Sequence, residues 1–179
     1  MDEYRAINHV RDGLYVTSLD GLFDLDTLNI DVVVSLTEKA ERHAKKISER
    51  VWRKCYIEDD DQTDLEVLLE WLEPVVASIN EDLDNNKAVL VHCYAGQSRA
   101  GMVVIATLIN RYGMTLQEAY KTVCKARQVI EPSVWFIWVL DLWAQKHGHD
   151  ASIPVARMTA KTNKYEWCSE LLRFQLTQR

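Results

Sequence analysis

The sequence predicts an α/β domain in which helices flank a central, mainly parallel β-sheet. Three observations support this fold class. Short β-branched runs, typical of buried strands, alternate along the chain with longer segments whose apolar residues recur every three or four positions, as on one face of a helix. The chain has 179 residues, the size of one ordinary domain. Its content of 47% hydrophobic and 27% charged residues is typical of a globular protein with a buried core.

Four strands are expected along the chain. They are the apolar runs at residues 13–16, 31–36, 51–57 and 87–91. The segments between the first three strands predict a short helix near residues 21–28 and a surface helix within residues 38–50. Because right-handed crossovers join parallel strands, the turns that follow these strands are expected to meet at one end of the sheet.

The clearest helix is expected at residues 65–83, where leucine, valine and isoleucine residues fall on one helical face. Thr63 and Glu66 form a capping-box pattern at its start. The segment 102–109 is apolar on nearly every side, which predicts a helix that is buried on most faces. Gly113 is expected to end that helix as its C-terminal cap.

Two further helices complete the predicted domain, and an extension follows it. Thr115 and Glu118 form a second capping box, and Pro132 and Ser133 begin a helix rich in aromatic residues. Residues 1–150 are expected to form the one domain. Residues 151–179 are expected to be a C-terminal extension, a linker plus a helix, which packs on the domain's own surface or mediates homodimer formation or partner binding.

Charge and composition exclude several classes of protein. The net charge of −6 disfavours non-specific binding to nucleic acid. No apolar run approaches the ~20 residues of a membrane helix, and the first residues lack the basic flank and apolar stretch of a signal peptide. We therefore expect a cytoplasmic protein, with the nucleus as the alternative compartment. No pair of cysteines has the close spacing of a zinc or redox motif, so no metal or other cofactor is expected.

The segment from His92 to Arg99 carries the residues of a candidate anion site. It connects a predicted buried strand to a predicted helix, and backbone N–H groups in such a turn converge where the helix N-terminus adds partial positive charge. Gly96 permits dihedral angles forbidden to other residues, and Arg99 offers a planar fork that matches two phosphate oxygens. The residues expected to bind phosphate are Tyr94, Ala95, Gly96, Gln97, Ser98 and Arg99.

Cys93 is expected to lie at the mouth of this loop. A thiolate in such an electropositive position is stabilised, so the side chain is a candidate nucleophile beneath a bound phosphoryl group. A cysteine and an arginine six residues apart often occur by chance. Here the preceding His92, the glycine, the strand before the loop and the helix after it all agree with the interpretation.

With these residues the chain resembles the dual-specificity branch of the cysteine-dependent protein tyrosine phosphatases. The family signature His-Cys-x2-Gly-x2-Arg is met by His92, Cys93, Gly96 and Arg99. Supporting similarities lie at residues 13–16, 28–36 and 127–140, so the resemblance covers roughly residues 10–146. It implies a protein tyrosine phosphatase-like fold and a catalytic domain within residues 1–150.

The resemblance also implies a general acid, an aspartate on a loop about thirty residues before the cysteine. The chain offers Asp59, Asp60 and Asp61. The family's Asp-x4-Asp-Ile pattern matches Asp59 together with Asp64 and Leu65, whereas the count back from the cysteine favours Asp61. We prefer Asp59 on the local match, and expect the other two carboxylates to be solvated and to shape selectivity.

The activity that the resemblance implies is hydrolysis of phosphotyrosine and phosphoserine or phosphothreonine monoesters in proteins, through a phosphocysteine intermediate. Cys93 would be the nucleophile, Arg99 would stabilise the phosphoryl oxygens, and Asp59 would act as acid and then base. His92 would support the loop.

One position departs from the family. Ala100 stands where a serine or threonine usually steadies the cysteine thiolate as a leaving group, which affects the second step. A phosphate-binding pseudophosphatase is therefore one alternative. An RNA 5′-phosphatase with the same chemistry is another, although the uncharged variable positions of the loop and the net charge of −6 disfavour it.

Overall fold

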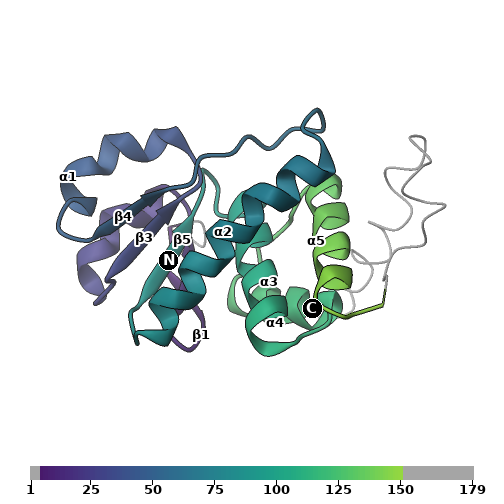
Figure 1. The fold of residues 1–179 in the computed structure, drawn as a ribbon. Coiled ribbons are helices and arrows are strands. Elements are labelled where there is room, and N and C mark those ends of the chain that lie inside the picture. Colours follow the sequence, from purple (N-terminus) through teal and green to yellow (C-terminus); the bar gives the residue numbers. More distant parts are fainter. Residues whose placement is uncertain (1–4, 151–179) are drawn as a thin grey trace.

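A five-stranded sheet forms the centre of the computed structural model, which describes residues 5–150 (Figure 1). The strands are β1 (Asn8–Arg11), β2 (Leu14–Thr17), β3 (Val32–Ser35), β4 (Val51–Lys54) and β5 (Val89–His92), in the spatial order β1-β2-β5-β3-β4. Only the β1–β2 pair is antiparallel, and the other three pairs are parallel. The mainly parallel α/β fold is therefore confirmed.

Helices cover both faces of this sheet. They are the 3₁₀ helices η1 (Asp20–Thr27) and η2 (Glu38–His43) and the α-helices α1 (Ala44–Ile47), α2 (Leu65–Asp84), α3 (Arg99–Tyr112), α4 (Leu116–Ala126) and α5 (Val134–Lys146). Figure 1 shows the α1 region on one side of the sheet and α2 to α5 on the other. The predicted helices at 21–28 and 38–50 exist, but as mainly 3₁₀ structure.

The central strands are buried on both faces, because successive side chains point to opposite sides of a sheet. Val32 and Val34 of β3 belong to the larger core, which contains residues of α2, α3, α4 and α5. Val33, together with Leu90 of β5, belongs to the smaller core that η1 and α1 cover. The continuous apolar runs of the sequence thus reflect two cores on the two sides of the sheet.

The strand β1 is missing from the sequence prediction. It forms a hairpin with β2, and the turn contains Asp12 and Gly13, whose φ angles are 44° and 83°. Two consecutive positive φ angles are typical of the tight turns that join hairpin strands, and Asp-Gly is a sequence signal for such a turn. The sequence therefore contains the turn signal. The strand itself gives no clear pattern, because β1 has only four residues of mixed polarity.

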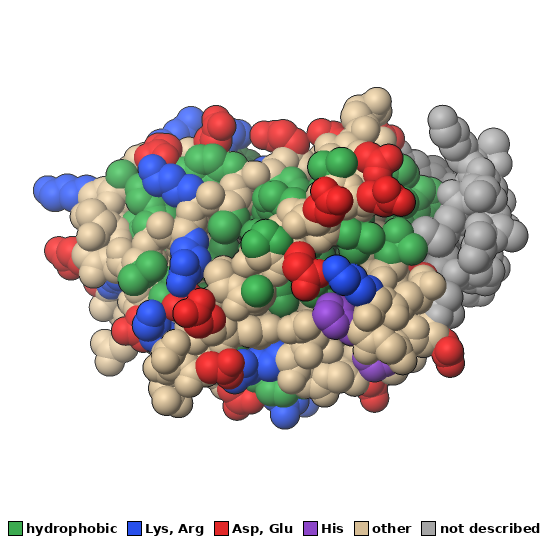
Figure 2. All heavy atoms as spheres, viewed as in Figure 1, with side chains coloured by type: hydrophobic (Ala, Val, Ile, Leu, Met, Phe, Trp, Pro, Cys, Tyr) green, Lys and Arg blue, Asp and Glu red, His purple; other side chains and the backbone are tan. Residues whose placement is uncertain are grey.

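The start of α2 differs from the predicted capping box. The N-cap is Asp64, whose side chain accepts a hydrogen bond from the Glu66 N–H at 2.7 Å. The Thr63 hydroxyl donates instead to Asp60, at 3.1 Å. The prediction was wrong by one residue because aspartate caps a helix as well as threonine does. Figure 2 shows acidic side chains gathered where α2 begins, the end of a helix that favours negative charge.

Two other predicted helix ends are confirmed. Thr115 and Glu118 form a capping box at the start of α4, and Gly113 ends α3 with a left-handed φ of 61°. The predicted C-terminal extension at residues 151–179 lies outside the described residues. Within residues 5–150, no helix combines the length and the apolar character that crossing a membrane requires.

Candidate active site

The sequence motif occupies the connection between β5 and α3, at the carboxyl ends of the parallel strands. β5 ends at His92 and α3 begins at Arg99, so the six residues between them form a loop at the helix N-terminus. Cys93 is only 2% exposed, and its Sγ accepts a hydrogen bond from the Gly96 N–H at 3.2 Å. At least one backbone N–H of the loop therefore points inward at the sulfur atom.

Gly96 is required by both the dihedral angles and the space of this loop. Its φ of 67° lies in the left-handed region that favours glycine. A Cβ atom at this position would lie 2.6 Å from the carbonyl of Thr17 and 2.7 Å from the nitrogen of Ser18. The loop thus packs directly against the backbone at the end of β2.

Arg127 holds the outer side of the same loop. Its side chain is 1% exposed; Nε donates to the carbonyl oxygen of Gly96 at 2.8 Å, and Nη2 donates to that of Ala95 at 3.3 Å. Nη1 donates to the carbonyl oxygen of Ala6 at 3.0 Å and to Oδ1 of Asn8 at 2.8 Å. One buried guanidinium therefore connects the loop to the N-terminal segment.

Further contacts fix the rest of the loop. The carbonyl oxygen of Tyr94 accepts from the Leu19 N–H at 2.9 Å, while the Tyr94 ring is 52% exposed. The ammonium of Lys39 lies 4.1 Å from the centre of that ring. Near the other end of the loop, the Ser98 hydroxyl accepts a hydrogen bond from the Ser133 N–H at 2.9 Å.

Arg99 connects the loop to the segment that carries the candidate acids. Its Nη1 donates to the carbonyl oxygen of Ile57 at 3.1 Å. Ile57 stands two residues before the first of the three consecutive aspartates. The structure therefore brings the backbone before the acidic segment to the arginine at the start of α3.

The three aspartates differ in their partners. Asp60 accepts hydrogen bonds from the backbone N–H groups of Thr63 and Gln62, both at 3.0 Å, and these bonds lower the pKa of its carboxyl group. Asp61 accepts from the side-chain amide of Gln62 at 2.8 Å. Among the contacts that the structure describes, the exposed Asp59 carboxylate has no hydrogen bond or ion pair.

His92 is fully buried beside the loop. Its Nδ1 lies 3.2 Å from the carbonyl oxygen of Cys93, and its Nε2 lies 2.6 Å from Oγ of Ser35. Burial lowers the pKa of the imidazole to about 4, which keeps the ring neutral at physiological pH. Ala100, which follows Arg99, is fully buried in the larger core.

Sequence reasoning gives no role to Arg127, Ser35 or Ile57. Arg127 stands at the start of a segment that resembles the family, and the other two lie in predicted strands. The contacts that make them relevant join residues 31, 57 and 42 positions apart in the chain. No local pattern of residues marks such pairs.

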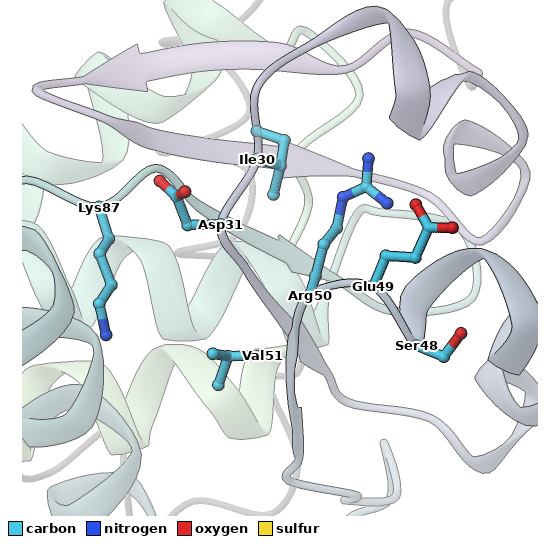
Figure 3. Close-up of a pocket in the computed structure, with 7 residues that line it drawn as sticks. All are labelled: Ile30, Asp31, Ser48, Glu49, Arg50, Val51 and Lys87. Carbon is cyan, nitrogen blue, oxygen red and sulfur yellow. The ribbon is translucent and has the colours of Figure 1, made fainter.

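A hollow of about 410 Å³ lies near the opposite ends of the strands (Figure 3). Its walls are formed by Ile30, Asp31, Ser48, Glu49, Arg50, Val51 and Lys87. Both of its cations already have carboxylate partners, because Lys87 lies 3.0 Å from Asp82 and Arg50 lies 3.2 Å from Asp26. The hollow contains no residue of the motif, and we assign it no part in the chemistry.

Comparisons with known proteins agree with the geometry. The family described as "Dual specificity phosphatase, catalytic domain" matches residues 14–146. The chain is 30% identical over 129 residues to dual specificity protein phosphatase 1 of Arabidopsis thaliana, covering 72% of this chain and 64% of that protein. It is 29% identical over 142 residues to dual specificity protein phosphatase MPK-4 of Drosophila melanogaster, covering 77% of this chain and 36% of that one. The chain thus spans less than two thirds of either relative.

Solved structures show the same fold. Human DUSP28 superposes with a TM-score of 0.67 at 24% identity, covering 78% of this chain and 93% of that chain. A human tyrosine phosphatase-like serine/threonine/tyrosine-interacting protein also gives a TM-score of 0.67, at 20% identity, and covers 80% of this chain and 98% of that chain. These likenesses concern the fold.

Proposed function

The chain belongs to the dual specificity phosphatase family of cysteine-based protein phosphatases, and from that membership we propose that it hydrolyses phosphate monoesters on protein side chains through a phosphocysteine at Cys93. Phosphotyrosine and phosphoserine or phosphothreonine residues are the substrates. The observation that carries the proposal is the hydrogen bond from the Gly96 N–H to the Cys93 Sγ, because it joins a cysteine to an inward-facing loop amide.

In the first step, the Cys93 thiolate attacks phosphorus, so that an S–P bond forms as the P–O bond to the leaving oxygen breaks. The backbone amides of residues 94–98 and the Arg99 guanidinium stabilise the equatorial oxygens. In the second step, water attacks phosphorus, the S–P bond breaks, and phosphate and the thiolate are released. His92 supports the loop through the carbonyl of Cys93.

Asp59 is the proposed general acid and base. It protonates the leaving oxygen in the first step and accepts a proton from the attacking water in the second. Two observations support the choice. Arg99 binds the carbonyl of Ile57, two residues before Asp59, and Asp60 is already engaged by the backbone of residues 62 and 63.

A reducing compartment suits this chemistry, because the nucleophile acts as a free thiolate. Cys55 and Cys93 are free thiols in the part of the chain that the structure describes. We therefore keep the cytoplasm as the proposed place of action, with the nucleus as the alternative.

Ala100 favours a second candidate, a phosphate-binding protein with slow turnover, because the hydroxyl that assists the second step in relatives is missing. Turnover of para-nitrophenyl phosphate, phosphopeptides and triphosphorylated RNA decides between these functions. We expect wild type to hydrolyse phosphopeptides and Cys93→Ser to be inactive while still binding tungstate. Residual turnover above a few percent in Cys93→Ser would remove Cys93 from the nucleophile role, and preferential hydrolysis of the RNA would replace the protein substrate.

A further inference from the structure

A chain of three buried or half-buried side chains leads from the edge of the sheet to the loop. Ser35 and His92 are register partners at the ends of β3 and β5, so their side chains point to the same face. Trp52 of β4 pairs with Val33, two residues before Ser35, and therefore shares that face. The Trp52 Nε1–H donates to Ser35 Oγ at 2.8 Å, and that oxygen lies 2.6 Å from His92 Nε2.

The direction of every hydrogen bond among these side chains is determined. A carbonyl oxygen only accepts, so the contact between His92 Nδ1 and the Cys93 oxygen at 3.2 Å requires the proton on Nδ1. The buried imidazole is neutral and carries one ring proton, which leaves Nε2 as an acceptor. Trp52 can only donate to Ser35, and Ser35 in turn donates its one proton to His92.

We propose that Ser35 is a positioning residue for the nucleophile. Its hydroxyl, held by the Trp52 indole, keeps the His92 ring oriented with its proton on Nδ1, and the ring in turn holds the carbonyl of Cys93 by a hydrogen bond. The peptide that follows the nucleophile is thereby fixed, which keeps the Gly96 N–H directed at Sγ. The inference rests on the proposed role of Cys93 as the nucleophile.

Removal of the Ser35 hydroxyl leaves two groups without this partner, the buried His92 Nε2 and the part-buried Trp52 N–H. A buried unpaired group is costly, so the ring and the indole shift to find other partners. The charged and titratable groups around this position are Arg99 from α3 and His43 from η2, both of which act on His92. Neither is changed by a substitution at Ser35.

The first test is the tautomer of His92, measured from the ¹⁵N shifts of its ring nitrogens in two-bond ¹H–¹⁵N spectra. The Cys93→Ser variant is used, so the result does not depend on catalysis. We expect the Nδ1–H form, unchanged from pH 8 to pH 5. A proton on Nε2 would overturn the proposal.

The second test is the pH dependence of alkylation at Cys93 by iodoacetamide, quantified on the Cys93 peptide because other free thiols also react. Ser35→Ala is expected to raise the pH midpoint by about one unit, which slows alkylation about tenfold below the midpoint. Ser35→Thr keeps the hydroxyl and is expected to restore the wild-type midpoint.

Thr107→Val is the matched control, since Thr107 is also fully buried and its hydroxyl donates to the Val103 carbonyl within α3, away from the loop. We expect this variant to lose thermal stability without a shift of the midpoint. An unchanged midpoint in Ser35→Ala, or an equal shift in Thr107→Val, would overturn the positioning role. A wild-type protein that alkylates as expected but turns over no phosphoester would instead contradict the proposed function alone.

Discussion

The adjacent carboxylates of Asp59 and Asp60 have different hydrogen-bond partners, which indicates different roles. Asp60 accepts hydrogen bonds from the backbone at residues 62 and 63 and stabilises the turn before α2. Asp59 has no such partner in the part of the chain that is described, and it stands two residues after the carbonyl that Arg99 binds. The surroundings therefore favour Asp59 for proton transfer and Asp60 for structure.

Asp59→Asn is expected to slow phosphopeptide hydrolysis by about 10²-fold, the usual size of general acid catalysis. A substrate with a good leaving group, such as para-nitrophenyl phosphate, should be slowed much less because its leaving oxygen needs little protonation. The measurement is kcat/KM for both substrates. Asp61→Asn is the matched control, and the same pattern in that variant would transfer the role to Asp61.

Ala100 leads to a prediction about the second step. A hydroxyl at this position would donate a hydrogen bond to the departing thiolate, worth roughly 1.5–3 kcal/mol. Without it, hydrolysis of the phosphocysteine should slow by about one to two powers of ten, whereas formation of the intermediate should be affected less. Stopped-flow traces with para-nitrophenyl phosphate should show a burst equal to the enzyme concentration.

Ala100→Ser should shrink that burst and raise kcat. Because Ala100 is fully buried, the thermal stability of the variant must be measured beside its kinetics. Linear progress from the first turnover, with Ala100→Ser unchanged, would show that another group assists the thiolate, either the Ser98 hydroxyl or a backbone amide such as that of Gly96.

At the scale of the elements, the contact between the C-terminal end of α4 and the loop from Cys93 to Ser98 stabilises the candidate site. Arg127→Met keeps an aliphatic side chain but leaves the carbonyl oxygens of Ala95 and Gly96 without this donor. We expect a loss of stability of about 2–4 kcal/mol and at least a tenfold loss of tungstate affinity. Calorimetric titration and urea unfolding measure the two effects.

Arg111→Met is the control for Arg127→Met. Arg111 makes an ion pair with Asp84 at 2.7 Å, near the C-terminal end of α3 and away from the loop. The Arg111→Met variant should lose little stability, since ion pairs near the surface contribute little to the free energy of unfolding. It should bind tungstate as the wild type does. Equal loss of tungstate affinity in both variants would mean that Arg127 does not act through the loop.

Local signals in the sequence predict the elements well where one pattern dominates. The four parallel strands, the amphipathic α2 and the glycine that ends α3 all follow from apolar spacing and caps. The hairpin strand β1 was missed because it has only four residues, none of them fully buried. The Asp-Gly turn is the local signal for it. The capping residue of α2 was misassigned because Thr63 and Asp64 are both good caps, and Asp60 decides between them by accepting the Thr63 hydroxyl.

The candidate site also contains residues that the sequence predicts and residues that it does not. The residues from His92 to Arg99 are contiguous, so the sequence reveals the loop and its chemistry. Ser35 and Arg127 contribute through contacts made only after the sheet and the helices have assembled. Long-range partners of this kind follow from strand order and packing, which one sequence does not display.

At the scale of the whole molecule, the buried His92 makes stability depend on pH. Its pKa is about 4 in the folded protein and has the ordinary value of 6.5 in the unfolded chain, so below pH 6.5 the unfolded chain binds a proton that the folded chain does not. Stability is therefore full above pH 6.5 and falls by about 3 kcal/mol as the pH approaches 4. Urea unfolding at pH 7.5 and pH 4.5 measures the loss.

Comparing the pH dependence of stability in wild type and in the His92→Asn variant isolates the part that is due to His92. The pKa values of His43 and His147 are also lowered, mainly by burial, and both groups remain in the variant. The carboxylates with lowered pKa values, such as Asp60, lose their contribution only below about pH 4. An equal pH dependence in wild type and His92→Asn would contradict the prediction.

The described fold also makes a prediction about the C-terminal extension. Among the residues that the structure describes, 5–150 form a sheet with a core on each side, and we therefore expect a chain ended after Asp150 to fold and to hydrolyse para-nitrophenyl phosphate within about twofold of the full chain. Sedimentation of both chains tests whether the extension mediates a homodimer, the alternative to packing on the domain's own surface. A dimeric full chain and a monomeric shortened chain would locate the interface in residues 151–179, whereas equal association states would exclude it.

The carbonyl contacts of the loop have a consequence for how an anion enters. Arg127 and the Leu19 N–H bind the carbonyl oxygens of residues 94–96. Because the C=O and N–H of a trans peptide point in opposite directions, the N–H groups of residues 95–97 are directed away from these donors before any phosphate arrives, and that of Gly96 already reaches the Cys93 sulfur. Binding then requires little loss of backbone conformational entropy, a cost of about 1–2 kcal/mol for every residue that must be ordered. A preorganised cradle of this kind therefore binds phosphate at a smaller ordering cost than a loop that must fold around the anion.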